Sequence, residues 1–123
     1  MPIRVLIFDD DTDILEICSI VLEDKGFEIY TCINCHHVIE KIEAVHPDVI
    51  LLDNRIPGKG GILTIQELKQ SAKYKHIPVI LFSANEDIAK IAHQAHADFF
   101  LEKPFNLDYL GTIVSTAAGI INK

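Results

Sequence analysis

The sequence predicts an α/β fold: a five-stranded parallel sheet with helices on both faces. Strand and helix patterns alternate five times along the 123 residues, and no repeat, linker or low-complexity segment interrupts them. The run Val49–Leu52 is apolar throughout, which is typical of a parallel strand covered on both sides. Right-handed crossovers then lead to a doubly wound (βα)5 sheet, and the length fits one domain over residues 1–123.

The chain opens with a strand pattern and a helix pattern. Residues 3–8 are rich in β-branched and aromatic side chains, and they stop at three successive aspartates. From residue 14 to residue 22, apolar side chains recur at helical spacing. Asp11 or Thr12 is the expected N-cap of this helix, and Gly26 is the expected C-terminal stop.

A second strand and helix follow, then the third strand. Residues 27–31 are predicted to form a short strand. Asn34 is predicted to cap a helix with apolar side chains between residues 38 and 45, ending at a His-Pro pair. The third strand, residues 49–52, ends at Asp53.

The second half of the sequence repeats this alternation, and residues typical of turns and caps mark the ends of its elements more clearly. A glycine-rich loop leads to a helix, and the fourth strand ends at a serine. The last strand ends near a Lys-Pro pair, and an asparagine caps the final helix. These predicted elements are a helix around residues 62–68, a strand at 78–82, a helix at 88–95, a strand at 99–101 and a helix at 107–117.

Composition excludes several classes of function. Lys and Arg total 11 against 18 Asp and Glu, a net charge of −7. An acidic chain of this kind is a poor binder of nucleic acid, whose affinity rests on clustered cations. The apolar runs are too short to span a bilayer, so no membrane insertion is expected. Three cysteines without a secretory signal favour a reducing compartment, and we expect the cytoplasm.

Polar side chains collect where the predicted strands end. Asp9, Asp10, Asp53, Ser83 and Lys103 follow the first, third, fourth and fifth strands. The carboxyl ends of parallel strands share one sheet edge, which is where ligands bind in such folds. One aspartate at a strand end is more often a cap or turn former. Five complementary groups together predict a Mg²⁺ site with a carboxylate nucleophile for phosphoryl transfer.

The same positions carry a family resemblance that covers essentially the whole chain. The motifs are Asp9-Asp10, then Asp53-Asn54-Arg55-Ile56-Pro57 with a later Gly61, then Ser83-Ala84, and finally Lys103-Pro104-Phe105. In this order and spacing the chain resembles the receiver domain of bacterial response regulators, the family that includes the chemotaxis regulators. That resemblance implies a flavodoxin-like fold with strand order 2-1-3-4-5.

The resemblance also implies roles for the acidic residues. Asp53 would be the phosphoacceptor, and Asp10 and Asp53 would bind Mg²⁺ directly. Asp9 would act through a coordinated water, and the backbone carbonyl of Arg55 would supply a further ligand. The chain would be a signalling switch that catalyses its own phosphorylation and dephosphorylation, rather than a turnover enzyme.

The remaining implied roles concern the response to phosphorylation. Ser83 and Lys103 would hold the phosphoryl oxygens, and Phe100 matches the family's switch aromatic. The phosphodonor would be a sensor histidine kinase or a histidine phosphotransfer protein. A downstream target protein would bind the surface of helix 4, strand 5 and helix 5. Phe100 lacks the hydroxyl of the Tyr often found there, and His96 replaces a common Gly.

Two other functions match parts of the same sequence pattern. The run Asp9-Asp10-Asp11-Thr12 superficially resembles the signature of haloacid-dehalogenase-type phosphatases, in which Asp9 would be the nucleophile. However, Asp13 stands where that family has Thr or Val, and its later acidic pair is missing. A receiver-like adaptor that works without phosphorylation is the other alternative, and the intact set of site residues argues against it.

One further motif has no part in this reading. Cys32-Ile33-Asn34-Cys35-His36 matches the pattern for covalent haem attachment, and its Cys-x-x-Cys also matches a redox pair. Zinc binding with His36 and His37 is a third option. We favour semi-buried thiols at the start of the second helix.

Overall fold

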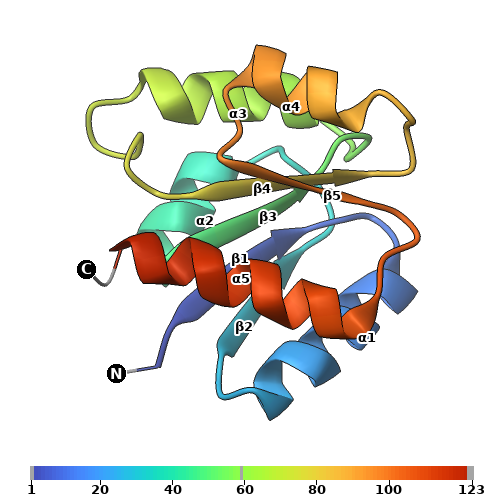
Figure 1. Cartoon of the computed structure of the whole chain (residues 1–123). Coiled ribbons are helices and arrows are strands. Elements are labelled where there is room, and N and C mark those ends of the chain that lie inside the picture. The colour runs from blue at the N-terminus through green and yellow to red at the C-terminus, as the bar shows by residue number, and fades with distance from the viewer. Residues whose placement is uncertain (1, 59, 122–123) are drawn as a thin grey trace.

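The computed structural model describes residues 2–58 and 60–121, with side chains described as far as residue 119. Five parallel strands form one sheet in the order β2-β1-β3-β4-β5, as expected (Figure 1). The strands are β1 (Arg4–Phe8), β2 (Glu28–Cys32), β3 (Val49–Asp53), β4 (Val79–Ser83) and β5 (Phe99–Glu102). The helices are α1 (Thr12–Asp24), α2 (Val38–Val45), α3 (Gly61–Gln70), α4 (Ile88–Ala95) and α5 (Leu107–Ile121).

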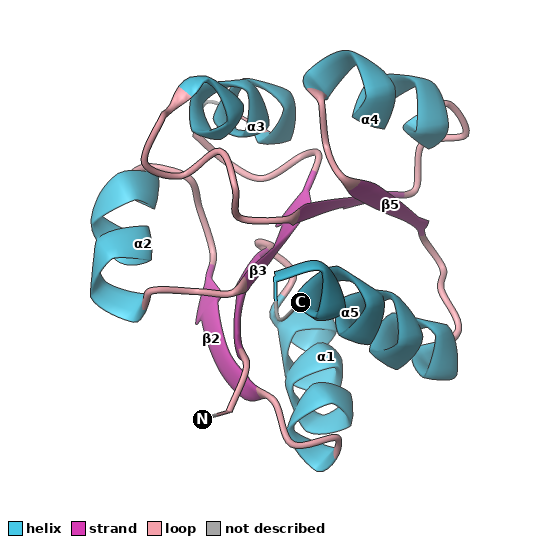
Figure 2. Ribbon diagram, turned by 60° about the vertical axis from the view of Figure 1, so that its left-hand side comes forward, coloured by secondary structure: helices cyan, strands magenta, loops and turns pink. Residues whose placement is uncertain are grey.

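The sheet separates two hydrophobic cores. Helices α2, α3 and α4 cover one face, while α1 and α5 cover the other (Figure 2). Alternate residues of the central strands contribute to opposite cores; in β3, Ile50 and Leu52 face one and Val49 and Leu51 face the other. Every residue of β3 and β4 is buried, which accounts for the apolar run in the sequence. Along the described chain, no helix is long and apolar enough to cross a membrane.

Most helix ends match the sequence signals, and one does not. Asp11 caps α1, because its side chain accepts from the backbone N–H groups of Asp13 and Ile14. Asn106 caps α5 in the same way. The prediction that Asn34 caps α2 is wrong. The N-cap is His37, with no side-chain hydrogen bond, and Asn34 Oδ1 instead accepts from the N–H of His36 in the preceding turn.

Two helices end at a histidine in the left-handed conformation. His46 follows α2 with φ 55°, and His96 follows α4 with φ 65°. Both N–H groups close the last turn by donating to the carbonyl of a helical residue. A side chain at such a position costs roughly 1 kcal/mol that glycine would not. His96, which replaces a common Gly of the resembling family, thus occupies a backbone position that favours glycine.

Candidate functional site

Three aspartates meet at the carboxyl edge of the sheet. Asp9 directly follows β1 and Asp53 ends β3, and these two strands are neighbours. Asp9, Asp10 and Asp53 each offer a carboxylate oxygen, and these oxygens lie within 4.8 Å of one another. Asp9 and Asp53 are buried, with 1% and 6% exposure, whereas Asp10 is exposed. The structure thus brings together the acidic residues that the sequence selected.

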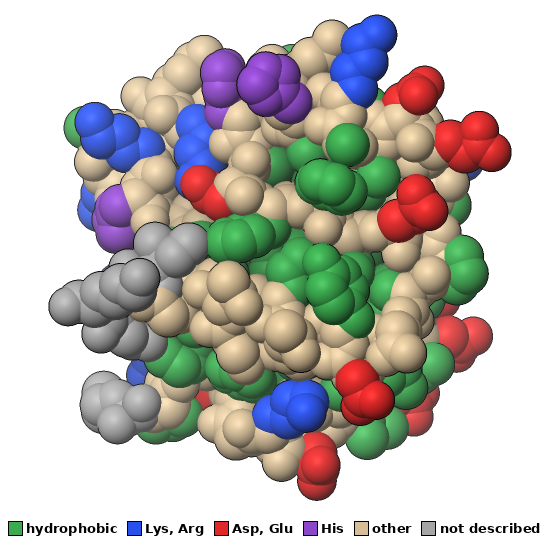
Figure 3. Space-filling model, viewed as in Figure 1, with side chains coloured by type: hydrophobic (Ala, Val, Ile, Leu, Met, Phe, Trp, Pro, Cys, Tyr) green, Lys and Arg blue, Asp and Glu red, His purple; other side chains and the backbone are tan. Residues whose placement is uncertain are grey.

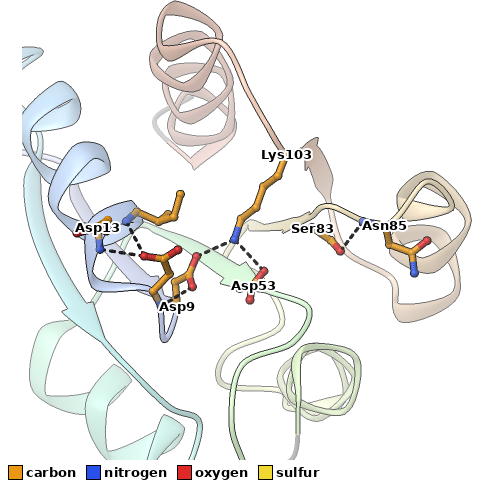
Figure 4. Close-up of polar contacts among 8 residues, drawn as sticks. Asp9, Asp13, Asp53, Ser83, Asn85 and Lys103 are labelled. Atoms are coloured by element: carbon orange, nitrogen blue, oxygen red, sulfur yellow. Dashed lines mark hydrogen bonds and ion pairs between the residues drawn. The ribbon is translucent and has the colours of Figure 1, made fainter.

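Lys103 bridges the two buried carboxylates. It follows β5, and its side chain extends across the sheet edge between Asp9 and Asp53 (Figure 4). Lys103 Nζ lies 3.0 Å from Asp9 Oδ2 and 3.2 Å from Asp53 Oδ1. The ammonium also lies 4.7 Å from the centroid of the Phe82 ring. Phe82 is a contact that the sequence analysis missed, because nothing in the strand pattern separates it from other buried aromatics.

In this group, burial and charge pairing shift the pKa values in opposite directions. Burial raises the pKa of Asp53, the charge of Lys103 opposes that rise, and the nearby Asp9 adds to it. For Lys103, burial lowers the pKa, but the hydrogen bond to Asp9 and the charges of both carboxylates outweigh it, so the pKa is raised. Both effects follow from two anions sharing one cation in a partly desolvated site.

Ser83 lies at the end of β4 with its side chain 3% exposed. Its hydroxyl oxygen accepts from the backbone N–H of Asn85 at 3.1 Å, so the side chain lies toward the loop before α4 (Figure 4). The Ser83 carbonyl accepts from the N–H of Lys103 at 2.8 Å. The ends of β4 and β5 are therefore linked directly.

The loop after Asp53 is held closely against α3. The N–H of Gly61 donates to the carbonyl of Asn54 at 3.2 Å. A Cβ at Gly61 would lie 2.9 Å from both Asn54 Cα and the Asp53 carbonyl oxygen, so only glycine fits this approach. A backbone hydrogen bond from Arg55 to the Asp53 carboxylate holds that side chain as well. The close approach of the Asp53 and Asn54 backbone thus explains why the sequence motif has glycine at position 61.

The Cys-x-x-Cys-His segment, described over its whole length, brings no three metal-ligating side chains together, and one of its two cysteines is buried. The aspartate cluster is the one group of three or more metal-ligating side chains found among the described residues. All three cysteines are thiols, and Cys35 is 1% exposed within the core. A core thiol cannot reach an external haem. The half-buried Cys32 and the buried Cys35 match the favoured reading of thiols before α2.

Hydrophobic side chains gather on the face formed by α4, β5 and α5 (Figure 3). Phe100 belongs to β5. Its side chain is 44% exposed, and Tyr109 on α5 is 51% exposed. Both line a shallow hollow of about 310 Å³ together with Phe99 and Ile113. The predicted switch aromatic therefore belongs to an apolar surface patch.

The donor set at the acidic cluster fits a hard divalent cation. Carboxylate oxygens from three residues converge, and oxygen is the ligand that Mg²⁺ prefers. Mg²⁺ takes one or two protein carboxylates and keeps other positions for water and phosphate, which suits a cluster with one exposed member, Asp10. Lys103 supplies fixed positive charge beside it.

Comparison with known proteins gives a consistent family assignment. The model of the response regulator receiver domain matches residues 5–115. The chain is 33% identical over 115 residues to the DNA-binding transcriptional regulator NtrC of Escherichia coli (strain K12), covering 92% of this chain and 24% of that protein. It is 32% identical over 108 residues to the Phosphate regulon transcriptional regulatory protein PhoB of the same strain, covering 86% of this chain and 47% of that one.

Solved structures agree with these relatives. A CheY-like response regulator receiver domain protein from Methanospirillum hungatei JF-1 superposes with a TM-score of 0.82 at 25% identity, covering 97% of this chain and 96% of that one. The chain thus spans nearly all of that structure, but only about a quarter of NtrC and half of PhoB.

Proposed function

Because this chain belongs to the response regulator receiver domain family of two-component signalling, we propose that it is a phosphoacceptor switch that takes a phosphoryl group on Asp53. One observation carries the proposal above all. The Asp53 carboxylate lies in a cluster with Asp9 and Asp10, and Lys103 Nζ is 3.2 Å away. A nucleophile, cation ligands and a fixed positive charge are together at one sheet edge, as phosphoryl transfer requires.

Asp9, Asp10, Asp53 and the backbone carbonyl of Arg55 are the proposed ligands of Mg²⁺. When bound, the cation would neutralise the negative charge of the carboxylates and of an incoming phosphoryl group. Asp9 is tied down by its ion pair with Lys103 and by the N–H of Asp11, which donates to Asp9 Oδ1 at 2.9 Å. These contacts orient the ligand before any substrate arrives.

In the proposed transfer, an Asp53 carboxylate oxygen attacks the phosphorus atom of a phosphohistidine. The new P–O bond forms as the P–N bond breaks, and the imidazole nitrogen leaves with the bonding electrons. Lys103 already lies beside Asp53 and neutralises charge on the phosphoryl oxygens. The Ser83 oxygen accepts from Asn85, but its own hydrogen remains available for a phosphoryl oxygen.

The donor that this family implies is a sensor histidine kinase or a histidine phosphotransfer protein, and we place the exchange in the cytoplasm. The proposed output surface is the face of α4, β5 and α5 that carries Phe100. Ser83 and Lys103 lie at the ends of β4 and β5, so engaging a phosphoryl group there pulls on both strands. Because Phe100 has no hydroxyl, its part in switching would be a change in packing. The DNA binding in the name of NtrC describes that longer protein.

The test is covalent labelling with acetyl phosphate in the presence of Mg²⁺. Wild type should form an acid-stable, hydroxylamine-sensitive acyl phosphate, and Asp53→Asn should abolish it. The control is Asp24→Asn, which removes the same charge at the exposed end of α1 and should label normally.

Peptide mapping separates the alternatives. Label on Asp9 would favour a haloacid-dehalogenase-type phosphatase and contradict the proposal. A folded wild type that takes up no label would favour an adaptor that works without phosphorylation.

A further inference from the structure

We propose that Cys32 and Cys35 form a redox-active pair, oxidised to an intramolecular disulfide by exchange with a small-molecule disulfide of the glutathione class. We further propose that this disulfide weakens cation binding at the aspartate cluster. The second part rests on the Mg²⁺ site proposed above, whereas the first part does not.

The Cys32 sulfur lies next to the peptide bond that leads into Cys35. Cys32 Sγ donates to the carbonyl oxygen of Asn34 at 3.3 Å, and that carbonyl belongs to the peptide bond with Cys35. The bonds from this oxygen to the Cys35 Cα add up to about 4 Å, so the Cys32 sulfur lies within about 7 Å of that Cα. Both side chains also pack in the same hydrophobic core. Disulfide closure then requires Cys35, with the short segment that carries it, to move toward Cys32.

The different exposure of the two thiols indicates the order in which they react. Cys32 is half-buried, so it is the thiol that an external disulfide can reach. Its sulfur attacks one sulfur of the small-molecule disulfide, forming a mixed disulfide and releasing one thiol. The core thiol of Cys35 then attacks the Cys32 sulfur and releases the second. The protein loses two hydrogens and is oxidised by two electrons, while one disulfide is reduced to two thiols.

The segment that carries both cysteines is hydrogen-bonded to two parts of the aspartate cluster, the end of β1 and the loop after Asp53. On one side, the carbonyl of Cys32 accepts from the N–H of Asp9 at 3.0 Å. On the other side, the N–H of Cys35 donates to the carbonyl of Pro57 at 2.8 Å. A Cβ built on Gly58 would lie 3.3 Å from the Cys35 backbone, so the loop after Asp53 packs directly on Cys35. A change in this segment therefore reaches Asp9 and the Asp53 loop together.

Disulfide closure changes these contacts in a definite direction. Cys32 loses the S–H that donates to Asn34, and Cys35 must turn out of its core position toward Cys32. Because Cys35 supports Pro57 and Gly58, its movement displaces the loop that orients Asp53. Mg²⁺ demands near-ideal octahedral geometry, so displaced ligands lower its affinity. Transient disulfides of this kind are the type found in reducing compartments.

The disulfide itself is tested by mass spectrometry after equilibration with glutathione redox buffers. Wild type should lose two hydrogens and two titratable thiols, with a crosslink mapped between Cys32 and Cys35. Cys18→Ser should behave in the same way. Cys32→Ser and Cys35→Ala should both lack the crosslink; alanine keeps the core position apolar, so folding is preserved. Glutathione adducts on Cys32 without an internal crosslink would overturn the proposal.

The coupling is tested by Mg²⁺ calorimetry on the reduced and oxidised protein. We expect the dissociation constant to rise by about threefold or more on oxidation, the scale of ordinary coupling between sites. Cys32→Ser, treated identically, should show no change. Equal constants in both states would overturn the coupling. A reduced protein that binds no Mg²⁺ would overturn the metal site and the coupling, while the crosslink is decided by the mass readout alone.

Discussion

Lys103 is the cation on which the balance of charge in the aspartate cluster depends. Its side chain is 18% exposed, and it pairs with two carboxylates whose side chains are 1% and 9% exposed. Removing one partner of a buried ion pair leaves the other charge uncompensated. Lys103→Met should therefore lower the free energy of unfolding by about 2–3 kcal/mol in Mg²⁺-free buffer, measured by urea denaturation at pH 7.

The matched control is Lys73→Met. Lys73 pairs with Glu43 at 3.3 Å, but both side chains are more than half exposed. Exposed pairs of this kind contribute little to stability, because water and salt screen them. If the two variants lose equal stability, the buried position of Lys103 has no special weight and the prediction is contradicted.

Asp53 should make the fold less stable as pH rises. Burial raises its pKa in the native state, so the native carboxyl keeps its proton where the unfolded chain has already lost it. The native state then binds more protons, and stability falls as pH increases from about 4, the ordinary Asp pKa, to the native pKa. In urea titrations with EDTA, Asp53→Asn should flatten this decline and be more stable than wild type at pH 7. If the free energy of unfolding varied with pH in the same way for both proteins, the prediction would be contradicted.

The identity of the acidic residues could be predicted from sequence, whereas side-chain directions could not. Aspartates and a lysine at strand ends converge because parallel strands finish on one edge. The hydrogen bond that Ser83 accepts from Asn85 depends on the path of the following loop, and the contact of Lys103 with Phe82 depends on a rotamer. Neither leaves a trace in residue spacing.

The start of α3 at Gly61 packs directly against the end of β3 and leaves no room for a side chain. Gly61→Ala would press a methyl group against the backbone of Asp53 and Asn54, which cannot move as a side chain would. Overpacking of this kind costs about 1–3 kcal/mol. We expect that loss of stability in urea denaturation, together with weaker Mg²⁺ binding in calorimetry.

Gly119→Ala in α5 is the matched substitution. A Cβ there meets nothing within 4 Å, and alanine is the better helix former. This variant should gain up to about 1 kcal/mol and keep Mg²⁺ affinity unchanged. A Gly61→Ala protein as stable as Gly119→Ala would show that the close approach is not limiting.

Helix starts show where local sequence signals succeed and where they compete. Asp11 lies directly before Thr12, the first residue of α1, and was predicted as a cap. Asn34 lies four positions before Val38, the first residue of α2, and its side chain closes a local turn onto His36 instead. Asparagine favours both arrangements with similar chemistry. Only the path of the β2–α2 loop decides between them.

The whole molecule should be stabilised by Mg²⁺, because a ligand that binds only the folded state shifts the folding equilibrium. At a free concentration of 100 times the dissociation constant, the gain is about 2.7 kcal/mol. Thermal unfolding of wild type and Asp24→Asn should shift upward with Mg²⁺, while Asp10→Asn should show a much smaller shift. An unchanged shift in Asp10→Asn would remove that residue from the proposed ligand set.

The architecture was predictable in two stages. Alternating patterns were enough for a parallel sheet with helices on both faces, because such sheets require crossover helices. The strand order β2-β1-β3-β4-β5 came from the family resemblance, since periodicity does not say which strands are neighbours. The strands β2 and β4 both lie one residue later than predicted, at Glu28–Cys32 and Val79–Ser83, because residue patterns locate strand ends less precisely than strand centres.

The ion pair between Asp9 and Lys103 joins residues 94 positions apart in the chain. During synthesis on a ribosome, the strands that bear the carboxylates therefore emerge long before their countercharge. A nascent chain that stops after β4 has buried acids with no ammonium to offset them. The native charge pairing of the cluster therefore cannot form until residue 103 has left the ribosome.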